Sequence, residues 1–305
     1  MSQFSKTPSF RVTPTLSEDH AGIGELAIPI LGLDGSGNDW ASGTAVVVAP
    51  WLAMTARHVV EDYQDRFGVT RAATGLDHHF QLLTCLTLKG GRDVLPLFVG
   101  RVWYCDPIDI ALLELQPASE FPIDYKWKVV PLSLQPPSVG DRVVAFGYAA
   151  SRVTGPASGV GEREWKTSPS TSVGEVLEVH QQSRDSVTLP FPCFRTNARF
   201  DGGMSGGPVF DEAGHVCGIV CSNLPPTHEH EDHASYASSL WMAMGILVNA
   251  NWDRVPVGTY YTVYELAQAG VLTVTGLENI QVIRTSAGSQ SVALRRPLAR
   301  STDAL

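Results

Sequence analysis

No apolar run in the sequence approaches the roughly 20 residues that a membrane-spanning helix requires. Residues 1–8 also lack a basic region followed by an apolar stretch, so we expect neither a transmembrane segment nor a secretory signal peptide. Cysteine is scarce, and its five residues form an odd, scattered set, which predicts buried free thiols rather than a disulfide framework. These absences favour the reducing cytoplasm as the site of action. The cysteines are Cys85, Cys105, Cys193, Cys217 and Cys221.

Positive charge is also in short supply. The chain has 22 lysines and arginines against 31 aspartates and glutamates, which gives a net charge of −9. An acidic surface disfavours nucleic acid and anionic membranes as partners. The hydrophobic fraction of 44% is typical of globular proteins, and 305 residues leave room for one large domain or two small ones.

Helical periodicity is nearly absent before Leu240. From Ser42 onward the chain consists of short β-rich runs separated by turns. Many short strands without alternating helices predict an all-β protein, either a sandwich or a pair of barrels. The clearest runs are residues 44–48, 94–102, 110–115, 142–146, 173–179 and 216–220.

Proline and glycine mark the boundaries between segments. Five prolines between residues 116 and 140 predict a connector between two halves, 21–132 and 133–250. Residues 1–20 read as an N-terminal arm and 152–169 as a loop. Residues 251–305 read as a C-terminal segment, with a short helix at 260–269 and a basic, weakly structured tail from 286. That tail is a candidate surface for a protein partner. No internal repeat is visible.

Ser205 lies in the run DGGMSGGP, residues 201–208. Glycines on both sides let the backbone turn sharply and let a substrate approach the main chain. The amides of Gly203 and Ser205 can then converge on one point, as an oxyanion hole requires. The alternative reading is a glycine-rich hairpin with an incidental serine.

Two further residues are candidate catalytic partners of Ser205. His58 follows the run MTAR, and we interpret it as closing an apolar strand, where a histidine can also be a core residue. Asp109 heads the apolar run IALLEL, whereas Asp106, the competing acid, precedes Pro107 and resembles a turn residue. The chain order His, Asp, Ser is the order of chymotrypsin and differs from that of subtilisin and the α/β-hydrolases.

These local sequences resemble the trypsin/chymotrypsin superfamily in the patterns T-A-x-H, D-I-A-L-L and G-x-S-G-G-P. The spacing is similar too, from 58 to 109 and from 109 to 205. The resemblance covers residues 40–250 and is strongest to the bacterial high-temperature-requirement branch. It is carried there by SGTAVV (42–47), VGDRVVAFG (139–147) and TNA (196–198). The segment beyond residue 250 is too short for the PDZ domain usual in that branch.

The resemblance implies two six-stranded Greek-key barrels of the chymotrypsin type, 21–132 and 133–250, followed by a short helical segment. It also implies a serine endopeptidase that acts on protein or peptide substrates and needs no cofactor. His58, Asp109 and Ser205 would be catalytic, and Gly203 and Ser205 would form the oxyanion hole. The alternative is a protease-like binding or scaffold module whose cleft is inactive or autoinhibited.

Two departures from the digestive enzymes bear on activation. Met204 stands where those enzymes place an aspartate that pairs with a newly freed N-terminus. Val59 follows His58, so their neighbouring disulfide is missing as well. We therefore expect an intracellular enzyme that assembles without N-terminal cleavage.

The resemblance also suggests where a substrate binds. Cys221, Ser222 and Asn223 would form an edge that pairs with the substrate backbone. Arg199 and Phe200 would lie near the specificity pocket. If Arg199 pointed inward it would favour an acidic substrate residue, but a solvated or paired arginine is the simpler expectation.

A histidine-rich segment, THEHEDH at 227–233, contains residue types that bind zinc. Because it is polar and follows two prolines, we expect a solvated charge cluster rather than a metal site. Its acidic side chains could alternatively rim the substrate cleft.

Overall fold

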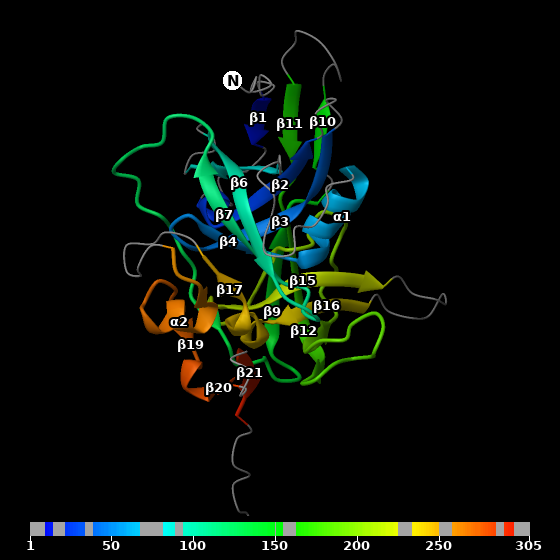
Figure 1. Cartoon of the computed structure of the whole chain (residues 1–305). Helices are drawn as coiled ribbons and strands as arrows, with labels where there is room; N and C mark the ends of the chain where they lie inside the picture. Colours follow the sequence, from blue (N-terminus) through cyan, green and yellow to red (C-terminus); the bar gives the residue numbers. More distant parts are fainter. Residues whose placement is uncertain are drawn as a thin grey trace, which may run out of the picture.

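The computed structural model shows two β-barrels stacked one above the other, with the C-terminal elements packed beside the second (Figure 1). It describes residues 10–14, 22–33, 39–67, 82–88, 94–149, 151–154, 163–224, 234–249, 258–284 and 290–295. No helix within these ranges is long and apolar enough to cross a membrane.

The first barrel is a closed ring of six strands in the order β2-β3-β4-β7-β6-β5. Every neighbouring pair is antiparallel. The strands are β2 (Ala27–Leu33), β3 (Asp39–Ala49), β4 (Leu52–Thr55), β5 (Leu82–Thr87), β6 (Val94–Tyr104) and β7 (Ala111–Pro117).

The second barrel closes in the order β9-β12-β13-β16-β15-β14, because β14 pairs with both β15 and β9. Numbered along the chain, the two rings have the same strand order, so the architecture contains a repeat that the sequence does not reveal. The predicted fold of two six-stranded barrels is confirmed. The strands are β9 (Arg142–Gly147), β12 (Ser170–His180), β13 (Cys193–Thr196), β14 (Pro208–Phe210), β15 (Val216–Leu224) and β16 (Ala234–Ser239).

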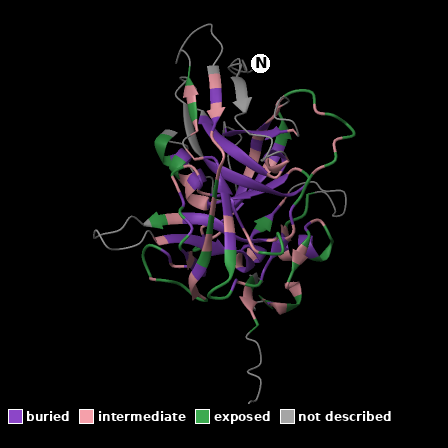
Figure 2. Cartoon of the chain, turned by 180° about the vertical axis from the view of Figure 1, so that it is seen from behind, coloured by how far each residue is buried: buried purple, intermediate pink, exposed green. Residues whose placement is uncertain are grey.

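Burial explains why these runs become strands. All residues of β4 and β5 are buried, as Figure 2 shows for the purple centre of the molecule. Such apolar runs fill the interior of a small barrel. All five cysteines are free thiols, four of them buried, as predicted.

Two segments predicted as arm and loop contain strands. β1 (Phe10–Pro14) pairs in parallel with β11 (Arg163–Thr167), which pairs antiparallel with β10 (Arg152–Thr154). Trp165 on β11 is 1% exposed and packs with Leu31 and Leu83 of the first barrel. This buried tryptophan explains why a segment rich in glycine and serine still forms an ordered strand.

The C-terminal segment packs against the second barrel. β19 (Val274–Thr275) pairs with β8 (Leu132–Ser133), which lies beside β15. The predicted helix at 260–269 is α2 (Val263–Gln268), which begins with a capping box of Thr262 and Glu265. The expectation of a weakly structured tail was wrong for 290–294, since β21 (Gln290–Leu294) pairs with β20 (Ile280–Arg284). The remaining elements are η2 (Ile23–Glu25), η3 (Leu240–Gly245), β17 (Leu247–Val248), β18 (Tyr261–Thr262) and η4 (Leu277–Asn279).

Candidate active site

His58 lies in the first turn of a helix, α1 (Arg57–Phe67), so the interpretation that it closes a strand was wrong. The strand before it, β4, ends at Thr55. Val59 and Tyr63 recur four residues apart and are buried, so one face of the helix packs on the barrel. The helix holds the imidazole at the seam between the barrels.

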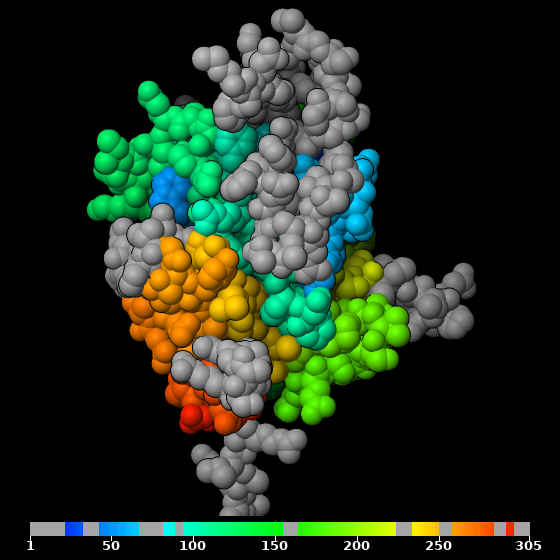
Figure 3. Space-filling model, in the orientation of Figure 1, coloured from blue at the N-terminus to red at the C-terminus, as the bar shows by residue number. Residues whose placement is uncertain are grey.

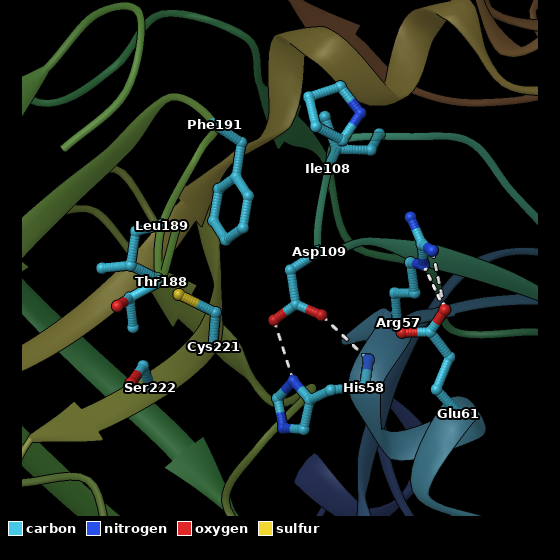
Figure 4. A pocket seen from close by; sticks show the side chains of 11 residues that line it. Arg57, His58, Glu61, Ile108, Asp109, Thr188, Leu189, Phe191, Cys221 and Ser222 are labelled. Carbon is cyan, nitrogen blue, oxygen red and sulfur yellow. Dashed lines mark hydrogen bonds and ion pairs between the residues drawn. The ribbon is translucent and has the colours of Figure 1, made fainter. Parts of the chain in front are cut away.

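Asp109 contacts His58 at two points. Its Oδ2 lies 2.8 Å from the ring Nδ1, and its Oδ1 accepts a hydrogen bond of 2.9 Å from the backbone N–H of His58 (Figure 4). The second bond satisfies one of the amides left unpaired at the start of α1. The carboxylate therefore fixes both the ring and the helix that carries it.

Arg57 fixes the turn that leads to Asp109. Its guanidinium contacts Glu61, at 2.7 Å, and Asp106, and it lies 4.8 Å from the ring centre of Tyr104. Asp106, the competing acid of the sequence, is 75% exposed in a turn and faces Arg57. It thus stabilises the turn and lies outside the pair that His58 and Asp109 form.

The charge around His58 favours its protonated form. Burial by itself would lower the pKa of His58, whereas the hydrogen bond and the charge of Asp109 raise it. The charges of Asp62 and Glu61 act in the same direction. The net effect is a pKa above the ordinary value of 6.5.

Ser205 lies in the second of two consecutive tight turns, residues 201–204 and 204–207. The N–H of Met204 donates to the carbonyl of Asp201 at 3.0 Å, and the N–H of Gly207 donates to the carbonyl of Met204 at 2.9 Å. The third residues of these turns, Gly203 and Gly206, have φ of +93° and +83°, the pattern of type II turns. Within the described ranges, the amides of Gly203 and Ser205 donate no hydrogen bond. Both donors are therefore available to a substrate oxygen.

Thr44 on β3 ties these turns to the first barrel. Its N–H donates to the carbonyl of Ser205 at 2.8 Å, and its hydroxyl donates to the carbonyl of Gly203 at 2.9 Å. The same hydroxyl accepts from the N–H of Tyr148 at 2.9 Å. Gly206 packs so closely on Thr44 and Ala56 that a Cβ there would lie 2.8 Å from the nitrogen of Ala56. Ser205 is thereby held beside the start of α1.

Met204 points away from solvent. Its side chain is fully buried in the core of the second barrel, and its sulfur accepts from the N–H of Asp201 at 3.3 Å. Apolar packing in the barrel core therefore holds the turn at residues 201–204 in place. The digestive enzymes carry an aspartate at the position of Met204.

A cavity of about 290 Å³ opens beside the pair of His58 and Asp109. Figure 4 shows Phe191, Leu189 and Thr188 on one side of it and the Arg57–Glu61 pair on the other. The three residues come from the loop between β12 and β13, which nothing in the sequence indicated.

The predicted edge segment borders this cavity through Cys221 and Ser222. Here β15 pairs with β16 on one side, while its described pairing with β14 ends at Ile219. Residues 221–223 therefore leave one backbone edge unpaired within the described chain. Burial, and next the charge of Asp109, raise the pKa of the Cys221 thiol well above its ordinary value, so the thiol stays protonated.

Arg199 and Phe200 lie before the two turns around Ser205 and are not among the residues that line the cavity. The side chain of Arg199 is 67% exposed and pairs with Asp201 at 2.7 Å. Phe200 is 1% exposed in the barrel core, and its carbonyl accepts from Asn223 at 2.6 Å. Asn223 thus holds the backbone at Phe200, five residues before Ser205, in place.

The histidine-rich segment 227–233, with His228, His230 and His233, lies outside the described residues. Among the residues that are described, no group of three or more His, Cys, Asp or Glu side chains could hold a metal ion.

Residues 43–219 match the family model of the trypsin-like peptidase domain. No curated protein matches the sequence at a significant level. Similar solved structures include the active form of the Rv3671c protease from M. tuberculosis, 17% identical, with a TM-score of 0.46 over 78% of this chain and 88% of that one. Deg5 is 17% identical, with a TM-score of 0.47 over 71% and 84%. The serine endoprotease from Yersinia pestis is 15% identical, with a TM-score of 0.44 over 73% and 62%.

The family model covers more than half of the 305 residues and includes His58, Asp109 and Ser205. This match confirms the predicted resemblance to the trypsin-like peptidases. The chain belongs to the trypsin-like peptidase family and is a serine endopeptidase that acts on protein or peptide substrates.

Proposed function

We propose that the chain hydrolyses peptide bonds through a triad of Ser205, His58 and Asp109 and an acyl-enzyme. The observation that carries this proposal is the two-point contact of Asp109 with His58, at 2.8 and 2.9 Å. It fixes the tautomer in which Nδ1 holds the proton and leaves Nε2 as the base.

In the proposed reaction, Nε2 of His58 takes the proton of the Ser205 hydroxyl while Oγ attacks the substrate carbonyl carbon. The amides of Gly203 and Ser205 stabilise the oxyanion, and Asp109 stabilises the imidazolium. His58 then protonates the leaving amine. A water molecule, activated by His58 in the same way, then attacks the acyl-enzyme and releases the carboxylic acid product.

Within the described chain, His58 forms no hydrogen bond with Ser205. Catalytic hydrogen bonds are often long before substrate binds, because the substrate excludes water and draws the groups together. We expect the bond between Nε2 and the Ser205 hydroxyl to form in the substrate complex.

A fluorophosphonate probe tests the nucleophile. Ser205→Ala is expected to abolish labelling and cleavage of an unfolded protein, whereas Ser119→Ala, at an exposed residue, should leave both unchanged. Asp109→Asn should lower kcat about 10⁴-fold, because the histidine loses its tautomer and its charge partner. Equal labelling of the Ser205→Ala chain would contradict the proposal. No labelling of the unmodified chain would favour a binding role instead.

A further inference from the structure

Tyr148, the residue directly after β9, links the second barrel to the first through its side chain. It is 1% exposed, and its hydroxyl donates a hydrogen bond of 2.9 Å to the carbonyl of Ala27, the first residue of β2. Its ring packs edge-on against Phe146, with the ring centres 5.5 Å apart. Burial raises the pKa of the phenol well above its ordinary value, so the hydroxyl keeps its proton and remains a donor.

The backbone of Tyr148 lies against the turn that contains Gly203. Its carbonyl oxygen would lie 2.6 Å from a Cβ at Gly203, so the two backbones pack closely. Its N–H donates at 2.9 Å to the hydroxyl of Thr44, which in turn donates at 2.9 Å to the carbonyl of Gly203. Because that hydroxyl accepts from Tyr148, its single proton is left for Gly203. A displacement of Tyr148 would therefore reach Gly203 by two routes.

The carbonyl of Tyr148 is also held by the β10–β11 hairpin. The hydroxyl of Ser151 donates to it at 3.2 Å, and the N–H of Ser168 donates to that hydroxyl at 3.4 Å. Ser151 lies directly before β10, and Ser168 lies directly after β11. The hydroxyl, the amide and the carbonyl of Tyr148 thus each have a partner, and the three partners belong to β2, β3 and the hairpin.

The hydroxyl of Tyr148 supplies what apolar packing alone would not. A phenylalanine would bury nearly the same ring in the same cluster with Ala27 and Phe146. A hydrogen bond, unlike a ring contact, fixes both the distance and the direction between its two partners. Because β2 belongs to the barrel that carries His58, this bond sets where the end of β9, and Gly203 beside it, lies relative to His58.

We propose that Tyr148 is a positioning residue for the oxyanion hole. The bond from its hydroxyl to Ala27 holds its own backbone, and through it the amide of Gly203, at a fixed position relative to His58. The inference rests on the proposed function, which assigns the Gly203 amide to the oxyanion. Tyr148 acts through Gly203 and does not touch the substrate.

Tyr148→Phe tests the proposal, because it removes the hydroxyl and keeps the ring. We expect kcat for a peptide amide substrate to fall about 10-fold with KM unchanged. That is less than the loss of about 10²- to 10³-fold that follows removal of a whole oxyanion donor, because the amide is displaced and not removed. Affinity for a peptide aldehyde, whose hemiacetal oxygen occupies the hole, should fall by a similar factor. Unchanged kcat and aldehyde affinity would overturn the proposal.

Tyr125→Phe is the matched control. The hydroxyl of Tyr125 donates to Glu25 at 3.2 Å, and the residue belongs to the connector 118–131, whose green atoms lie at the upper left of Figure 3. Loss of that hydroxyl should leave kcat and aldehyde affinity unchanged. An equal fall in both variants would assign the effect to a general loss of stability and overturn the positioning role.

Ser151→Ala tests the same link without altering a fully buried side chain. It removes the donor to the Tyr148 carbonyl and should lower kcat about 3-fold with KM unchanged. Its control is Ser133→Ala, which removes a hydroxyl that donates at 3.2 Å to the carbonyl of Gln135 and should not lower kcat. Full kcat in the Ser151→Ala chain would count against the role of the Tyr148 backbone.

The amide signal of Gly203 separates this inference from the triad. In protein made with isotope-labelled glycine, Tyr148→Phe should shift the magnetic resonance signal of the Gly203 amide. The signal of Gly214, whose N–H donates to Asp211 at 3.0 Å in another turn, should stay in place. An unshifted Gly203 signal would overturn the positioning role even if Ser205 is the nucleophile. A shifted signal, with no fluorophosphonate labelling of the unmodified chain, would overturn the triad and leave the link between Tyr148 and Gly203 standing.

Discussion

At the scale of single residues, the proposed oxyanion hole depends on the backbone conformation of Gly203. Its φ is +93°, and a Cβ there would lie 2.6 Å from the carbonyl oxygen of Tyr148. Any other residue would have to rotate the peptide and so move the amide away from the proposed oxyanion site.

We therefore expect Gly203→Ala to lower kcat/KM about 10²- to 10³-fold, the loss typical of removing one oxyanion donor. Gly214→Ala is the matched control, since φ there is +79° but the added Cβ meets no atom within 4 Å. Both variants should lose about 1–2 kcal/mol of unfolding free energy from the positive φ, and Gly203→Ala should lose more, because its Cβ also meets the carbonyl oxygen of Tyr148. Only Gly203→Ala should lose activity, measured with a peptide ester. Full activity in that variant would contradict the assigned hole.

The raised pKa of His58 predicts the pH dependence. Because His58, the proposed base, must be neutral to accept a proton, kcat/KM should rise with pH around a midpoint above 6.5. The same shift means that His58 stabilises the fold fully below about pH 6.5, and that this contribution is lost as pH rises through the folded-state pKa.

Asp62→Asn should move that midpoint to lower pH, because it removes a negative charge that raises the pKa of His58. Asp65→Asn is the control. Asp65 lies on the same helix, but its charge acts on Asp62 and is not among those that raise the pKa of His58. The effect should shrink as salt is added. An unmoved midpoint in Asp62→Asn at low ionic strength would exclude this electrostatic account.

At the scale of elements, β11 links a peripheral sheet to the core. Trp165→Ala should cost about 3–5 kcal/mol of unfolding free energy, measured by urea denaturation, because it empties a buried site. Trp165→Phe should cost much less. The indole N–H is buried without a hydrogen-bond partner in the described structure, so its removal relieves a penalty while the ring contacts remain. Equal losses in both variants would argue against this packing role.

The elements also show where prediction from sequence succeeds. The runs at 44–48 and 216–220 were predicted as strands and lie in β3 and β15. Their apolar side chains fill the barrel interiors, which is why the pattern is visible in the sequence. The helix α1 was missed because Val59 and Val60 follow the strand run directly. The four-residue spacing of Val59, Tyr63 and Phe67 was the helical signal. The sequence indicated β15 as a wall of the candidate site, but the loop at 184–191 depends on backbone hydrogen bonds that residue patterns do not display.

At the scale of the whole molecule, Thr44 joins the barrels through both its backbone and its hydroxyl. Thr44→Val keeps the volume but removes the hydroxyl, which leaves the N–H of Tyr148 without its acceptor. We expect a loss of about 1–3 kcal/mol in unfolding free energy and slower fluorophosphonate labelling. Thr84→Val is the control, because the buried hydroxyl of Thr84 has no partner in the described structure, so that variant should be neutral or stabilising. Identical behaviour of the two variants would contradict the role of Thr44.

His58 and Asp109 belong to the first barrel, whereas Ser205 and its turns belong to the second. Domains generally fold in the order in which they leave the ribosome. In the proposed mechanism, a nascent first barrel would therefore carry the base without its nucleophile and would not cleave the proteins around it. Competence would arise only when Thr44 meets the turns of the completed second barrel. The onset of probe labelling during translation would therefore mark the moment at which the two halves dock.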